Sequence, residues 1–108
     1  MTVSESLKSI NNYPIPPYVL TKSAIKNGMS LEEEVTSEIL ISREYRLMEA
    51  DVYAFLAGAP DITQNGVSFS FSQEQREWFL SMSNGIKTEL GVEDSSTGQG
   101  YGYMGEDY

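Results

Sequence analysis

A run of apolar residues spaced by three and four, in the middle of the chain, constrains the fold more than any other feature. This spacing brings the residues onto one face of an α-helix, which turns once in about 3.6 residues. A long central helix over roughly 37–58 is therefore predicted, capped by Thr36 or Ser37 and ended by Gly58 and Pro60. The apolar stripe consists of Ile41, Tyr45, Met48, Val52, Phe55 and Ala59, and is widened by Leu40, Leu47 and Leu56.

Two further helices are predicted from capping boxes. In this motif a Ser or Thr is followed three residues later by Glu or Gln, and each side chain accepts a hydrogen bond from the other residue's backbone N–H. The motif stands at residues 2–5 and at residues 72–75. It predicts a first helix over 3–11 and a last helix over about 73–90.

Pro17 and Gly28 mark the ends of another predicted helix, because Pro is favoured at the first helical position and Gly just after the last. A third capping box at Ser30 predicts a short turn of helix over 31–35. The acidic run 32–34 would then lie in a first helical turn, where the helix dipole favours it. We interpret these carboxylates as solvated, and not as a cation site.

The segment QNGVSFSFS, which follows the central helix, predicts a β-hairpin over 61–72. Asn65-Gly66 favours a two-residue type I′ turn, because both central positions of that turn need a positive φ. In a strand after the turn, alternate residues point to opposite faces. The apolar face would carry Val67, Phe69 and Phe71 and pack against the helical bundle, and the polar face would carry Ser68 and Ser70.

These elements predict a mainly α fold, a small bundle of about four helices with one short hairpin before the last helix and a loose C-terminal tail. We expect one domain over 1–91 and an acidic, Gly- and Tyr-rich tail over 92–108. The expected core consists of Leu7, Ile10, Leu20, Ile25, Leu40, Tyr45, Leu47, Met48, Val52, Phe55, Leu56, Phe69, Trp78, Phe79, Met82 and Ile86.

The composition argues against several classes of function. The net charge of −9 disfavours nonspecific binding to nucleic acids or anionic membranes, which depends on Lys and Arg. The chain has no His and no Cys, which are the usual general base, nucleophile and transition-metal ligands. Glu44, Glu49 and Asp51 are interpreted as a solvated helix face beside two arginines. We expect no cofactor, no metal and no enzymatic activity.

The predicted hairpin offers a surface for a protein partner. Natural proteins usually protect a free strand edge with Lys, Pro or a covering segment, and this strand contains neither residue. A second chain could add a strand there, or the hairpin could simply cover the helices. The tail is the other candidate docking segment. The candidate interface residues are Asn65, Gly66, Ser68, Ser70, Tyr101 and Tyr103.

The order of elements resembles the head–tail connector proteins (head-completion or adaptor proteins) of tailed bacteriophages and prophages. That order is short helix, Pro-rich turn, helix, long helix, hairpin, helix and loose tail. The hairpin residues that carry the resemblance are Ile62, Gly66, Ser68 and Ser70.

The resemblance implies a non-enzymatic structural protein of the virion, assembled in the host cytoplasm. Members of this family form a ring of identical subunits between portal and tail proteins, and DNA passes through the channel without specific binding. No membrane contact is implied. An acidic surface suits such a channel.

An alternative class is an acidic interaction or inhibitor protein that imitates DNA and binds a basic protein partner. A DNA mimic should present many acids along one face of regular structure. Four of the sixteen acids lie in the tail and the rest are scattered, so the sequence favours the connector. An enzyme is the least favoured class, because no two acids are flanked by residues that would form an apolar pocket.

Overall fold

The computed structural model describes residues 1–92. This part of the chain is mainly helical, with a two-stranded antiparallel hairpin before the last helix, which confirms the predicted fold class. The elements follow the order α1 (Val3–Lys8), α2 (Pro17–Asn27), α3 (Ser37–Leu40), α4 (Arg43–Ala57), β1 (Ile62–Gln64), β2 (Val67–Phe69) and α5 (Gln73–Glu89).

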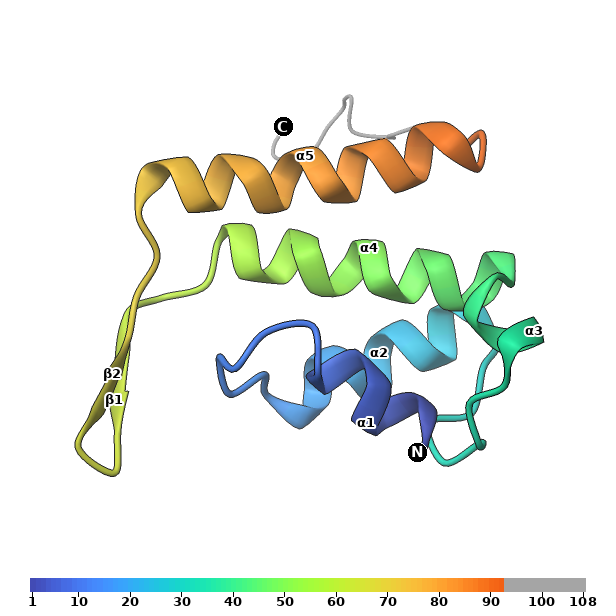
Figure 1. The fold of residues 1–108 in the computed structure, drawn as a ribbon, viewed down its shortest axis with the longest axis horizontal. Coiled ribbons are helices and arrows are strands. Elements are labelled where there is room, and N and C mark those ends of the chain that lie inside the picture. Colours follow the sequence, from blue (N-terminus) through green and yellow to red (C-terminus); the bar gives the residue numbers. More distant parts are fainter. Residues whose placement is uncertain (93–108) are drawn as a thin grey trace.

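Helix α4 is the centre of the fold, as its apolar stripe predicts. It lies between α5, which runs antiparallel to it along one side, and the pair α1 and α2 on the other side (Figure 1). The hairpin extends from the end of the molecule where α4 stops and α5 starts (Figure 1). Close packing of α4 against α5 is possible because two small residues, Ala50 and Ser83, meet there, and the Ser83 hydroxyl donates to the Ala50 carbonyl at 2.8 Å.

The central helix begins later than predicted. Residues 37–40 form the separate short helix α3, and α4 starts only at Arg43. Ser42 interrupts the helix because its hydroxyl accepts from the Tyr45 N–H at 3.2 Å and donates to the Ile39 carbonyl at 2.7 Å. Such side-chain bonds compete with the helix and cap it. Ile41 therefore leaves the stripe and is 79% exposed.

The predicted turn of helix at 31–35 is wrong. This segment is irregular and supplies backbone carbonyls to the N-terminus of α1, where the Val3 and Ser4 N–H groups donate to Glu33 and Leu31. The first N–H groups of a helix have no partner inside it. Pairing with a distant segment satisfies them here, and this outweighs the local preference for helix.

Of the sixteen predicted core residues, eight are buried, five are half-buried and three are exposed: Ile25, Leu40 and Trp78. Helix α2 packs on α4 through Leu20 and Ala24, which leaves Ile25 on the other side. Three buried hydrophobic residues were not predicted: Tyr13 and Ile15, which lie in the Pro-rich segment between α1 and α2, and Ala50 of α4.

The hairpin has the predicted turn. Asn65 and Gly66 have φ values of 53° and 79°, and the strands pair in the register Ile62 with Phe69 and Gln64 with Val67. Strand β2 ends at Phe69, two residues before the predicted end, because Pro60 has no N–H to extend the partner strand. Val67 was expected to face the bundle and is instead exposed near the turn.

Candidate protein-interaction surface

The base of the hairpin is held by two side chains from distant parts of the chain. The Tyr13 hydroxyl donates to the Pro60 carbonyl at 2.6 Å. Arg76 of α5 donates to the Ala59 carbonyl at 2.6 Å and forms an ion pair with Asp61 at 3.2 Å. These bonds fix the strand that enters the hairpin. Sequence reasoning missed both residues, since contacts across 47 positions for Tyr13 and 17 positions for Arg76 leave no local signal.

Aromatic rings support the other strand. Phe69 and Phe71 pack against Tyr13, with ring centroids at 6.1 and 5.5 Å, and Phe71 meets Phe79 of α5 edge-to-face at 4.8 Å. Such pairs contribute about 0.5–1.5 kcal/mol each beyond the area they bury. The apolar face of the hairpin is therefore used for attachment to the domain, as predicted for Phe69 and Phe71.

The opposite face and the turn are exposed. The predicted interface residues Asn65, Gly66, Ser68 and Ser70 are all exposed, and they lie together on one arm. Ser70 lies one residue beyond the end of β2. Tyr101 and Tyr103, the two predicted interface residues of the tail, lie outside the described residues.

The register fixes which backbone groups are free. A two-residue turn is closed by a hydrogen-bonded pair, here Gln64 with Val67, and hydrogen-bonded and non-bonded pairs alternate along an antiparallel ladder. Thr63 and Ser68 are then a non-bonded pair, so the N–H and C=O of Ser68 point away from β1. Within residues 1–92 the sheet has only two strands, and no other strand pairs with this edge of β2.

A polar groove of about 240 Å³ runs beside β2. Its walls come from the hairpin, from the loop after α1 and from the start of α5. The hairpin contributes Val67, Ser68, Phe69, Ser70 and Phe71 to the lining, and the remaining lining residues are Asn11, Asn12 and Gln75. An extended peptide in this groove would find backbone partners on β2 and side-chain amides on the other wall.

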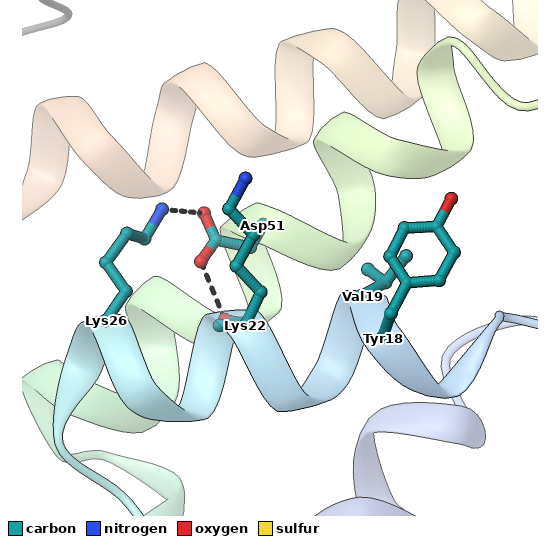
Figure 2. A pocket seen from close by; sticks show the side chains of 6 residues that line it. Tyr18, Val19, Lys22, Lys26 and Asp51 are labelled. Atoms are coloured by element: carbon teal, nitrogen blue, oxygen red, sulfur yellow. Dashed lines mark hydrogen bonds and ion pairs between the residues drawn. The ribbon is translucent and has the colours of Figure 1, made fainter.

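A second surface lies on α2. Tyr18, Lys22, Ile25 and Lys26 form it, and we call it the α2 surface. A groove of about 240 Å³ lies between α2 and α4 beside this surface. Figure 2 shows Lys22, Lys26 and Asp51 close together above α2 at one end of the groove, with Tyr18 at the other end.

Asp51 of α4 binds three polar side chains of α2 at this groove. Its carboxylate accepts from Ser23 at 2.6 Å and from Asn27 at 3.2 Å, and pairs with Lys26 at 3.0 Å. Its side chain is only 18% exposed, so the interpretation of Asp51 as part of a solvated helix face is wrong. These contacts join α2 to α4.

Burial raises the pKa values of three side chains on α4. Glu49 is half-buried, and the loss of solvent raises its pKa, while the nearby Arg46 at 3.5 Å acts in the opposite direction. Burial likewise raises the pKa of Tyr45, whose hydroxyl contacts Ser6, and the pKa of Tyr53. Glu49, like Asp51, is thus not a solvated residue.

Residues 1–92 contain no group of three or more acidic side chains placed to hold a metal ion. No helix in this same range is long and apolar enough to cross a bilayer. Comparison of the chain with protein-family models, with curated proteins and with solved structures gave no match. The class defined by the structure is a helical bundle with a β-hairpin arm before its last helix.

Proposed function

We propose that the protein is a non-enzymatic assembly protein that pairs the free edge of β2 with a neighbouring chain. The observation that supports this most is an unprotected strand edge on an arm that Tyr13 and Arg76 hold in place. Serine is a suitable outward residue on such an arm, because it is small enough for close approach and can donate or accept a hydrogen bond.

A single edge contact is weak. Each net hydrogen bond contributes about 0.5–1.5 kcal/mol, whereas association costs an estimated 4–15 kcal/mol of translational and rotational freedom. A few bonds along β2 cannot hold two copies together when the protein is dilute. Assembly therefore needs high concentration, or several contacts that act together.

The hairpin has two different edges, one on β1 and one on β2, and the choice of edges that pair determines the symmetry of the assembly. If the β2 edge of one copy pairs with the β1 edge of the next, the contact is head-to-tail and repeated contacts can close a ring. If two β2 edges pair with each other, the result is a twofold dimer. We propose the ring, in agreement with the resemblance to head–tail connector proteins.

In that setting the protein is an adaptor between the portal and tail proteins of a phage or prophage particle, and a component of the virion. Its net charge of −9 would let DNA pass through the ring without binding to it. No cofactor takes part in this role.

The test is the mass of the protein as a function of concentration, measured by sedimentation velocity and native mass spectrometry. We expect a monomer when dilute and closed rings when concentrated. Ser70→Pro should abolish the rings, because proline removes one backbone donor beside the edge. A strictly monomeric protein at every concentration, or a twofold dimer alone, would contradict the proposal.

Ser70→Ala is the matched control. It removes the hydroxyl and keeps the backbone N–H, so rings should form as in the unchanged protein. Both variants should keep the circular-dichroism spectrum of the unchanged protein, since Ser70 is exposed and lies outside the regular strand. Loss of assembly in both variants would show that the side chain, and not the backbone, makes the contact.

The inhibitor class receives less support from the structure. The acidic run Glu32–Glu34 lies in the loop between α2 and α3, where it does not extend along one face of a helix. A DNA mimic needs its carboxylates in a regular array, so this run does not favour that role.

A further inference from the structure

The α2 surface combines exposed apolar side chains with positive charge in a strongly acidic protein. Tyr18 is 67% exposed and Ile25 is 78% exposed, although both are large and apolar enough for a core. They are seven residues apart and so share one helix face, with Lys22 between them. A hollow of about 400 Å³ lies on this face. It is lined by Tyr18, Thr21, Lys22, Ile25 and Lys26.

The charge of α2 is unlike that of the rest of the chain. Residues 17–27 contain two lysines and no acid, while the whole chain has a net charge of −9. Lys26 pairs with Asp51 at 3.0 Å, but Lys22 forms no ion pair with any residue in 1–92. The α2 surface therefore fits an occupant that is acidic and carries aromatic or apolar side chains.

We propose that this occupant is the C-terminal segment of the same chain, residues 93–108. Tyr101 and Tyr103 would fill the hollow beside Tyr18 and Ile25, and the acids of the segment would lie near Lys22. The proposal is independent of pairing at the β2 edge, because it concerns a different face of the molecule.

The composition of the segment matches this surface. Residues 93–108 contain four acids, three tyrosines and no Lys or Arg. A tyrosine ring can cover an apolar side chain, attract a lysine ammonium over its face and still present its hydroxyl to water. The charges and the apolar groups of the two partners are thus complementary.

The length of the segment is sufficient. The C-terminus of α5 lies beside the start of α4, where Arg43 donates to the Leu90 carbonyl at 2.6 Å. Asp51, which holds Lys26, is about 12 Å further along α4 at 1.5 Å per residue. Helix α2 lies across α4 from α5, two helix-packing distances of about 10 Å away, so the direct distance is about 23 Å. Tyr101 follows Val92 by nine residues, which span up to about 30 Å when extended. The segment can therefore reach the α2 surface of its own chain.

The absence of cysteine makes a direct test possible. A single Gly105→Cys substitution, two residues after Tyr103 in the full chain, would carry a nitroxide spin label, and backbone NMR signals would be compared with and without the active label. We expect selective loss of signal over residues 18–26, and little loss at the exposed end of the hairpin. Uniform signal along α2, or loss centred on another element, would overturn the proposal.

Two substitutions sharpen the test. Lys22→Glu should restore the signals of α2, because it replaces the attracted charge by a repelling one. Lys8→Glu is the matched control, since it changes the net charge equally on the exposed end of α1 and should leave the signal loss unchanged. Equal effects of the two substitutions would show that the signal loss depends only on net charge, which would contradict docking on this surface.

A mixed sample identifies whose segment is bound. Isotope-labelled protein without the nitroxide would be combined with spin-labelled protein without isotope. Docking within one chain predicts that signals over residues 18–26 stay intact in this mixture. Signal loss there would show that a second copy supplies the segment, and the proposal of docking within one chain would fail.

Discussion

At the residue scale, a few side chains do more than their sequence context indicates. Arg76 joins α5 to the entry of the hairpin through Ala59 and Asp61, and Asp51 joins α2 to α4. Both look like ordinary surface charges in the sequence. Their partners are far along the chain, so only the tertiary structure brings the donors and acceptors together.

Glu49 gives a prediction on pH dependence. Burial raises its pKa in the folded state, so the folded protein holds the proton of the Glu49 carboxyl group more tightly than the unfolded chain does. The stabilising effect of the proton is complete below the unfolded pKa, about 4.3, and is lost as the pH rises through the folded value. Glu49→Gln should therefore raise the melting temperature at pH 7, with the difference vanishing below about pH 4.

Glu77→Gln is the control for this comparison. It removes the same charge from an exposed position of α5, and Arg46 keeps its second partner, Glu89, in both variants. The gain in melting temperature should be larger for Glu49→Gln. Equal gains would attribute the effect to net charge, and a lower melting temperature for Glu49→Gln would show that its pairing with Arg46 outweighs the cost of burial.

At the element scale, local signals predicted the structure correctly where no distant segment competed for the same backbone groups. The two capping boxes at Thr2 and Ser72 and the Asn-Gly turn occur where the sequence predicts them, because each is formed by neighbouring residues. The segment 31–35 was mispredicted because its carbonyls bind the start of α1. The exposure of Ile25 was missed because periodicity cannot tell which face of α2 another element covers.

Ser42 provides a prediction for helix α4. It is the N-cap residue, and its hydroxyl makes hydrogen bonds to Tyr45 and Ile39 that separate α4 from α3. Ser42→Ala should lower the free energy of unfolding by about 1 kcal/mol, the usual cost of losing a cap. The measurement is urea denaturation followed by circular dichroism.

Thr36→Ala is the comparison for Ser42→Ala. It removes the cap of the four-residue helix α3, which contains no buried residue, so it should cost less. If Ser42→Ala instead stabilised the protein, residues 37–57 would be better described as the continuous helix that the apolar stripe predicts.

At the scale of the whole molecule, the residues that stabilise the fold differ from those that we propose bind a partner. The buried residues of α1, α2, α4 and α5 form one core around α4, and the hairpin contributes its apolar face to the edge of that core. The polar face and free edge of the hairpin lie outside the bundle (Figure 1). The sequence was sufficient to predict this arm, but not the side chains that hold it.

The most direct measurement of the central claim is amide hydrogen exchange, resolved by residue, at low and high protein concentration. The amide of Ser68 points away from β1, whereas those of Val67 and Phe69 belong to hydrogen-bonded pairs inside the hairpin. We predict that exchange at Ser68 slows markedly as the protein assembles, while exchange at Val67 and Phe69 changes much less. Fast exchange at Ser68 in a sample shown by mass to be assembled would contradict pairing through this edge.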